Sequence, residues 1–149
     1  MAKTDRPELK KTDRARFRGM NHNYEWVYGD VVHASENTNT LCIVHSLEDY
    51  EPDKIYSESL GQFTGYYDRF HTPIYEGDLI LPLEGPEGEM MVKFIDCGWY
   101  AVDQSHKSLL SYYEYTYIKD YPDETHILDV DITGTVFEKY GKSEPGVQR

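Results

Sequence analysis

The side chains of this chain that could do chemistry are histidines and carboxylates, and their spacing decides which chemistry is open to them. A metal site built on one element needs histidines at a short, regular spacing such as HxH or HExxH. Neither spacing occurs here, so a metal centre would require histidines to converge from distant loops. The sequence therefore predicts no metal site and no metal cofactor from its six histidines, which are His22, His33, His45, His71, His106 and His126.

Two pairs of carboxylates lie closer together in the sequence than the histidines do. Asp129 and Asp131 are two residues apart on an expected strand, so both side chains point to the same face. Such a pair can hold a cation or share a proton. The same alternation is typical of a solvent-exposed strand face, and this is the interpretation that we favour. Glu76 and Asp78 flank Gly77, where carboxylates usually accept hydrogen bonds from nearby backbone amides.

The sequence carries none of the common enzyme motifs that can be read from spacing. It contains no nucleophile elbow, no phosphate-binding loop and no dinucleotide fingerprint. We therefore predict that the protein is not an enzyme, with no catalytic residues, no cofactor-binding residues and no cofactor. An enzyme whose site is assembled from loops is the least favoured alternative.

The other segments are organised around residues 60–80, LGQFTGYYDRFHTPIYEGDLI. Turns centred on Gly65 and Gly77 bracket a polar loop with aromatic and β-branched flanks, and such flanks suit a pleated, half-buried surface. Glycine tolerates a positive φ at little cost. We expect a positive φ at Gly77, where the next strand begins.

Alternation of apolar and polar residues predicts strands at 24–28, 41–45, 78–83, 90–94, 99–102 and 128–132. The Gly-Asp pair at 29–30 is expected to end the first of them. Turns at 85–88 and 96–98 join three strands into a meander of two hairpins. A bent meander closed by other strands predicts a mainly β, single-domain fold, an SH3-like, partly open β-barrel with additional strands and little helix.

The alternation also predicts which side chains face the core. On the meander we expect two inward-facing sets, Leu79, Leu81 and Leu83, then Met90, Val92 and Phe94. Residues 127–137 fit a strand pair or one kinked strand, in which Leu128, Val130 and Ile132 face inward. Gly134 permits a bulge or turn there. Residues 108–118 fit either a short helix or a strand, and we favour a short helix or irregular segment first.

The length of 149 residues predicts one domain. Residues 1–16 should form a flexible basic arm, residues 17–140 the β domain and residues 141–149 a disordered tail. The chain contains 14 tyrosines. Tyrosine suits the rim of a β-rich core and also a self-association surface, and the sequence leaves both readings open.

The net charge of −12 is unevenly distributed along the chain. Residues 1–18 hold seven Lys or Arg and three Asp or Glu, which gives +4, and the remaining eight and twenty-four give −16. A body this acidic repels phosphate backbones, so nucleic-acid binding is disfavoured. The alternative is an association with nucleic acid through the basic arm. The acidic surface could also mimic DNA towards a host DNA-binding protein.

The two cysteines, Cys42 and Cys97, form no CxxC motif and no cluster with histidine at metal-binding spacing. We detect no signal peptide, and no apolar run approaches the roughly 18 residues of a membrane span. We therefore expect buried free thiols in a soluble, cytoplasmic protein that does not enter a membrane.

The central stretch GQFTGYYD, followed by PIYEGDLI, resembles the signature of the YopX protein family of phages and prophages. The upstream RFRGMNHNYEWVYGDVV resembles the family's N-terminal box, and VDITGTVFE resembles its C-terminal box. Order and spacing agree over residues 17–138, with departures at residues 66–67 and 133–135. The resemblance implies a fold and a phage origin more than an activity. We expect a non-enzymatic accessory protein in the bacterial host cytoplasm that forms a homo-oligomer and binds host or phage protein partners.

Overall fold

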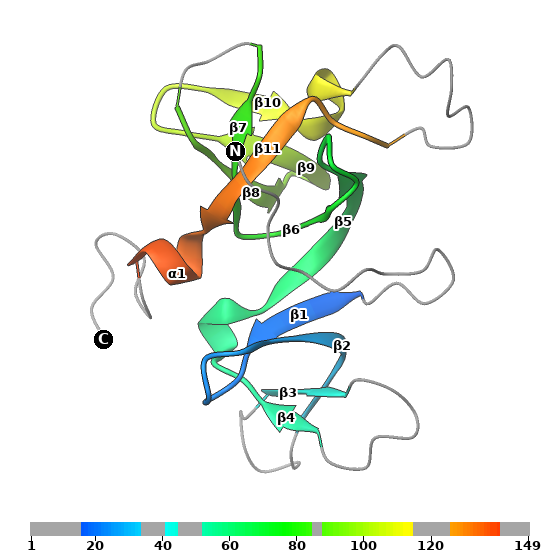
Figure 1. Cartoon of the computed structure of the whole chain (residues 1–149), viewed down its shortest axis with the longest axis vertical. Helices are drawn as coiled ribbons and strands as arrows, with labels where there is room; N and C mark the ends of the chain where they lie inside the picture. Colours follow the sequence, from blue (N-terminus) through cyan, green and yellow to red (C-terminus); the bar gives the residue numbers. More distant parts are fainter. Residues whose placement is uncertain (1–15, 34–40, 45–51, 85–87, 115–125, 141–149) are drawn as a thin grey trace.

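The computed structural model describes residues 16–33, 41–44, 52–84, 88–114 and 126–140, and these form two antiparallel sheets (Figure 1). The first sheet has the order β4-β3-β2-β1-β5-β6. Its strands are β1 (Phe17–Met20), β2 (Trp26–His33), β3 (Leu41–Val44), β4 (Asp53–Lys54), β5 (Gly61–Tyr67) and β6 (Pro73–Tyr75). The second sheet has the order β10-β9-β8-β7-β11. Its strands are β7 (Asp78–Pro82), β8 (Met90–Ile95), β9 (Gly98–Val102), β10 (Lys107–Leu109) and β11 (Val130–Thr135).

Helical structure in the described residues consists of two 3₁₀ turns, η1 (Ser57–Ser59) and η2 (Leu110–Tyr113), and one short helix, α1 (Val136–Tyr140). The predicted mainly β fold with little helix is therefore confirmed. The described strands form two open sheets rather than a closed barrel. No helix in the described ranges is long and apolar enough to span a membrane.

The predicted arm and tail lie outside the described residues, apart from Arg16. Its backbone carbonyl accepts a hydrogen bond of 2.7 Å from the Phe63 amide in β5. Residue 16 is thus already attached to the first sheet.

Strand β6 lies between the larger hydrophobic core and aromatic rings of the first sheet. Ile74 belongs to the larger core, which lies against the second sheet and η2. Its other members are Ile80, Met90, Val92, Ala101, Leu110, Tyr113, Leu128, Val130 and Ile132. The next residue, Tyr75, contacts the rings of Tyr28 and Phe63 in the first sheet. Adjacent strand residues point to opposite faces, so β6 contacts the larger core through Ile74 and the rings of the first sheet through Tyr75. A smaller core in the first sheet consists of Val27, Ile43 and Ile55.

The predicted meander is confirmed as β7, β8 and β9, but the larger core lies against the face of β7 opposite to the one that we expected to be inward. Ile80 is the β7 residue in the larger core, where it pairs with Met90 and with Ile132. Leu79 and Leu81 lie on the opposite face, where Leu79 is buried and Leu81 is half-buried, and Leu83 lies beyond the end of the strand with an exposed side chain. A period-two pattern with apolar residues on both faces does not say which face is covered.

Phe94 is a second exception on the meander. Met90 and Val92 are buried as predicted, whereas 53% of Phe94 is exposed. Phe94 lies near the end of β8, beside Trp99 of β9. Its cross-strand neighbour Trp99 packs against the larger core, whereas Phe94 lies outside that core.

The first long strand continues through the Gly-Asp pair that was expected to end it. Gly29 pairs with Phe17 of β1, and Asp30 pairs with Val44 of β3, so β2 is held from both sides in turn. Tyr24, predicted to be in the strand, lies in the preceding turn with φ of 61°. Pairing with two neighbours outweighs the weak strand propensity of Gly and Asp.

The two ambiguous segments have definite structures where they are described. Residues 107–109 form β10 and residues 110–113 form η2, so the segment begins as a strand and the expected short helix is a 3₁₀ turn that starts only at Leu110. Residues 115–118 lie outside the described residues. In β11 the register shifts between Ile132 and Gly134, which confirms the predicted bulge. The chain then enters α1, so Phe137 is helical and not in a strand.

Both described cysteines are free thiols. Cys42 is buried as expected, but Cys97 is exposed. Cys97 lies in the tight turn between β8 and β9 with φ of 63°. A hairpin turn at the end of a sheet has little around it to cover a side chain, which corrects the expectation of two buried thiols.

Candidate functional site between the two sheets

The turn at residues 75–78 joins the first sheet to the second and is fixed from several directions. Gly77 has φ of 89°, which confirms the predicted positive value. The Gly77 amide donates to the Val92 carbonyl, and the Gly77 carbonyl accepts from the Val136 amide, at 2.9 and 2.7 Å. These bonds attach the turn to β8 and to the start of α1.

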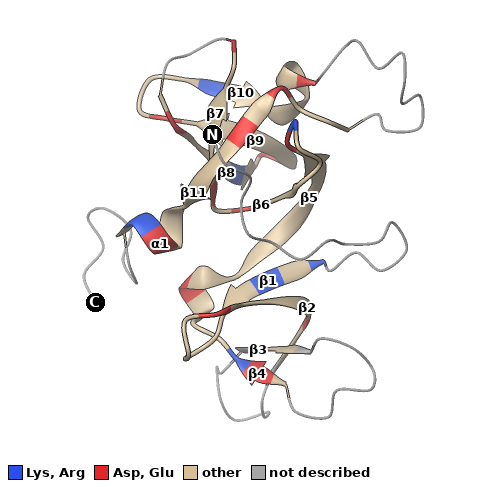
Figure 2. Ribbon diagram, in the orientation of Figure 1, with Lys and Arg blue, Asp and Glu red and all other residues tan. Residues whose placement is uncertain are grey.

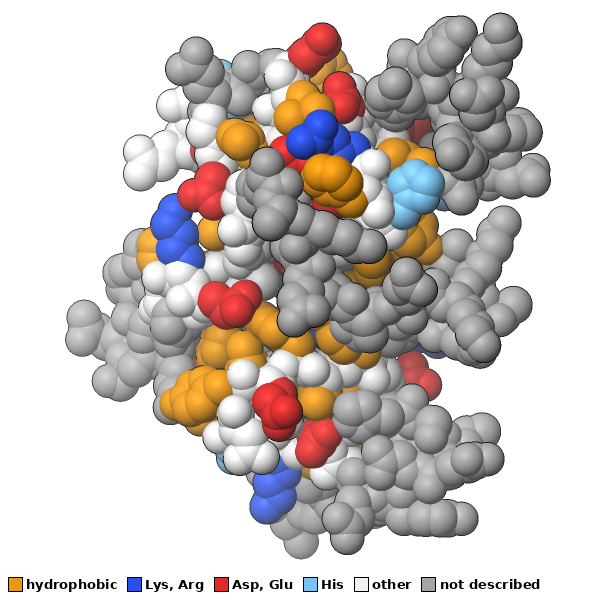
Figure 3. Space-filling model, viewed as in Figure 1, with side chains coloured by type: hydrophobic (Ala, Val, Ile, Leu, Met, Phe, Trp, Pro, Cys, Tyr) orange, Lys and Arg blue, Asp and Glu red, His pale blue; other side chains and the backbone are white. Residues whose placement is uncertain are grey.

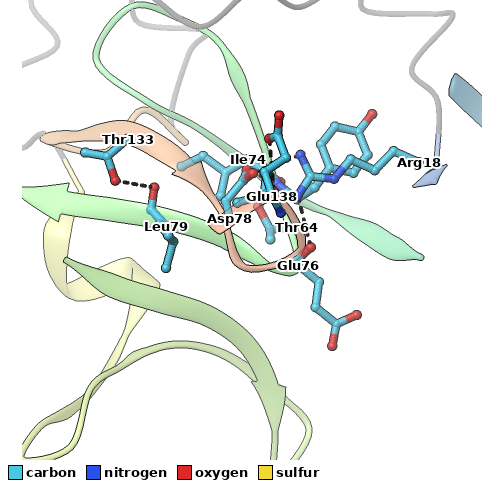
Figure 4. Close-up of polar contacts among 10 residues, drawn as sticks. Arg18, Thr64, Ile74, Glu76, Asp78, Leu79, Thr133 and Glu138 are labelled. Carbon is cyan, nitrogen blue, oxygen red and sulfur yellow. Dashed lines mark hydrogen bonds and ion pairs between the residues drawn. The ribbon is translucent and has the colours of Figure 1, made fainter. Parts of the chain in front are cut away.

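A buried ion pair spans the two sheets at this turn. Arg18 of β1 and Asp78 of β7 are 1% and 0% exposed, and Arg18 Nη1 lies 2.9 Å from Asp78 Oδ1. Asp78 Oδ2 also accepts a hydrogen bond from the Tyr75 amide at 2.8 Å. Figure 4 shows the Arg18 side chain reaching from β1 towards Asp78 and the carbonyl of Glu76. In the sequence Arg18 is the last of the seven cations of residues 1–18, whereas the structure places it in the interior.

Aromatic rings surround this guanidinium. The Arg18 guanidinium carbon lies 4.4 Å from the centre of the Trp26 ring and 5.2 Å from that of Tyr75. The ring quadrupole attracts a cation placed over its face. Trp26 also meets the edge of Phe137, and Phe137 stacks on Tyr56 at 5.9 Å. The rings therefore continue from the buried arginine towards the surface.

A pocket of about 160 Å³ opens beside the ion pair. It is lined by residues of both sheets, of η1 and of α1, which are Arg18, Trp26, Glu58, Ser59, Leu60, Glu76, Gly77, Met91, Val92, Lys93, Thr135, Val136 and Phe137. A cavity of about 150 Å³ holds one benzene molecule. The pocket therefore has room for one side chain and not for a nucleotide-sized ligand.

The buried hydroxyls of the lining already hold the backbone. Ser59 Oγ donates to the Tyr56 carbonyl and accepts from the Met20 amide. Thr135 Oγ1 accepts from the Glu138 amide at 3.0 Å and so caps α1. These groups shape the pocket, and the arrangement is suited to binding.

Asp129 and Asp131, which the sequence places on a solvent-exposed strand face, are not both exposed in the structure. Asp131 is only 4% exposed and forms two hydrogen bonds with Arg69, from Nε at 2.5 Å and from Nη2 at 3.2 Å. The hydrogen bond to Asp131 raises the pKa of the Arg69 guanidinium. The interpretation as an exposed face is wrong for Asp131, because a long side chain from the loop before β6 covers it. Asp129 is half-buried.

The histidines whose side chains the structure describes lie apart. His22 stacks near Tyr56, His126 meets the edge of Tyr66, and His106 lies beside Asp103. Backbone amides, that of Ser105 first, lower the pKa of Asp103. Within the described ranges no three His, Cys, Asp or Glu residues are placed to hold a metal ion. His45 and the side chain of His33 lie outside those ranges.

The site could not be predicted from the sequence because its residues come from six separate segments, namely residues 18, 26, 58–60, 76–77, 91–93 and 135–137. The signal that the sequence did contain is the turn at Gly77, and the aspartate after that turn is the partner of Arg18.

The sequence model of one protein family, described as YopX protein, matches residues 16–138. The match extends from β1 to α1 and includes the whole lining of the pocket. Comparison with curated proteins gives no match.

Proposed function

This chain belongs to the YopX protein family, and from that premise we propose that it is a phage or prophage accessory protein that acts by binding proteins and not by catalysis. The observation that carries the proposal is the pocket between the sheets, whose rings extend to the surface and whose buried polar groups are engaged in structural contacts. We infer that such a site binds a ligand and does not transform it chemically. The bacterial host cytoplasm is the compartment that we assign to it.

Self-association is the second part of the proposal and is supported by the second sheet. Strand β10 is an edge strand, and its Leu109 is 47% exposed. Phe94 and Tyr112, also on this sheet or directly after it, are exposed as well. Open edges with apolar side chains favour pairing with another chain. Patches of hydrophobic side chains are also visible in the space-filling view (Figure 3).

We expect light scattering after size-exclusion chromatography to give a multiple of 17.4 kDa, because two copies can cover the exposed side chains of this sheet. Leu109→Lys should shift the assembly towards the monomer, since it places a charge on the edge strand. Tyr140→Lys, an exposed position on α1, is the matched control. A monomer of the unaltered chain at high micromolar concentration would remove self-association from the proposal.

Nucleic-acid association through the arm is the competing function, and the acidic body argues against it. Carboxylates lie on both sheets in Figure 2. Because Arg18 is buried, at most six cations remain in residues 1–16 to meet phosphates, namely Lys3, Arg6, Lys10, Lys11, Arg14 and Arg16. If six phosphates are neutralised, the logarithm of the binding constant falls with the logarithm of the salt concentration with a slope of about −5. Repulsion by the acidic body should make this slope shallower.

We therefore expect labelled duplex and single-stranded DNA to bind at physiological salt no more tightly than about 10⁻⁴ M, the non-specific range. A full-length variant with these six residues changed to Gln should lose even that binding. Fluorescence anisotropy of both proteins decides the point. Submicromolar binding that survives in the variant would favour a nucleic-acid protein over the proposed one.

A further inference from the structure

We propose that the pocket between the sheets receives one lysine or arginine side chain from an extended segment of a protein partner. This inference rests on the proposed protein-binding function and specifies what the partner presents. It follows from the size of the pocket, from the chemistry of its walls and from its charge.

The size of the pocket limits the ligand to a single side chain. At about 160 Å³ it matches a cavity that holds six or so heavy atoms. Larger small-molecule sites begin at roughly 300 Å³. A lysine or arginine stem with its terminal group fits this limit.

The walls suit a long aliphatic stem followed by a cation. Leu60, Met91 and Val136 supply apolar surface, and Trp26 and Phe137 supply aromatic rings. Lysine and arginine bury their methylene stems against apolar surface while the charged head stays near polar groups.

The charges of the lining favour a positive ligand. Asp78 lies against Arg18 and balances its charge. The remaining charged residues of the lining are Glu58 and Glu76, both negative, and Lys93, positive, which leaves one net negative charge. The chain outside residues 1–18 carries eight positive and twenty-four negative side chains, a balance of −16. This charge attracts a basic segment that comes within a Debye length of the surface, and it repels an anionic ligand.

A row of rings provides the surface along which an extended segment can approach. Tyr24, 63% exposed in the turn before β2, lies 5.9 Å from Tyr56, and Tyr56 stacks on Phe137 at the pocket. Asn21 Oδ1 holds this turn by accepting the amides of Asn23 and Glu25. Tyr24 keeps a positive φ of 61° there, and strained backbone of this kind clusters at binding sites.

The two tryptophans provide a test on the full-length protein. Trp26 lines the pocket, whereas Trp99 packs on the larger core beside Phe94 and does not line it. With 5-fluorotryptophan incorporated, ¹⁹F NMR shows one resonance for each, and Trp99→Phe assigns them. The probes are the N-acetyl methylamides of lysine, arginine, norleucine and glutamate, titrated to about 50 mM, which saturates a site with a Kd near 1 mM.

We expect the lysine and arginine probes to shift the Trp26 resonance saturably while Trp99 stays unchanged. The norleucine and glutamate probes should shift it far less. Glu58→Gln should weaken binding of the lysine probe about two- to fivefold, which is the effect of losing an exposed charge pair. Glu25 is exposed and lies outside the lining, so Glu25→Gln should leave the affinity unchanged. No Trp26 shift with either cation, or an equal shift with norleucine, would overturn the inference.

The basic residues of this chain's own arm are the other possible occupant. In the full-length variant with the six cations of residues 1–16 changed to Gln, probe affinity should be unchanged. A rise in affinity would show that the arm competes for the pocket and would overturn the assignment to a partner. The light-scattering result is independent of these titrations, so a failed titration leaves the self-association half of the proposed function standing.

Discussion

Replacing Arg18 with methionine should lower the free energy of unfolding by about 3–5 kcal/mol, the range for breaking a buried ion pair from one side. The change leaves the Asp78 carboxylate, which is 0% exposed, without the guanidinium that balances its charge between the two sheets. Methionine keeps much of the side-chain volume, so the loss reports the charge more than a cavity. Urea denaturation followed by circular dichroism measures the change.

A second variant separates the charge from the packing. The double variant Arg18→Met, Asp78→Asn should lose clearly less free energy of unfolding than the sum of the two single variants. In the double variant no unpaired charge is left, and the asparagine oxygen can still accept from the Tyr75 amide. Lys107→Met is the matched control, since Lys107 and Asp96 are 3.6 Å apart with 50% and 77% exposed side chains. It should cost at most about 1 kcal/mol. A loss below that value for Arg18→Met would show that the buried pair does not hold the sheets together.

Replacing Gly61 with alanine should destabilise the protein by about 3 kcal/mol, at the upper end for overpacking. A methyl carbon at Gly61 would lie 2.3 Å from the Glu76 carbonyl oxygen. That oxygen belongs to the turn at residues 75–78, and the Glu76 amide is itself bonded to the Gln62 carbonyl at 2.9 Å. The backbone at Gly61 and the backbone at Glu76 cannot move apart without breaking the contact between β5 and that turn.

Gly134→Ala is the matched control for this change. A methyl group at Gly134 meets no atom within 4 Å, so the cost should be near zero, with a small gain from the stiffer unfolded chain. Urea midpoints of both variants decide the point. Equal midpoints would mean that the approach of Gly61 to the turn relaxes without penalty.

The local features of this fold could be predicted from the sequence. The meander of β7, β8 and β9 and the positive φ of Gly77 depend on neighbouring residues alone, through side-chain alternation and the missing Cβ of glycine. The bulge at Gly134 has the same kind of cause. The family could likewise be identified from the order and spacing of the boxes GQFTGYYD and PIYEGDLI, because these are properties of the linear chain.

The pocket and the burial of its charges were decided by the tertiary structure. Arg18 bonds the Glu76 carbonyl across 58 residues, and Arg69 covers Asp131 across 62. Contacts at such separations leave no trace in local periodicity, so the sequence groups Arg18 with the basic residues 1–18 and places Asp131 on a solvent-exposed face. The same reason explains why Ile80, and not Leu79, is the β7 residue in the larger core: alternation defines two faces, and only tertiary packing determines which of them meets that core.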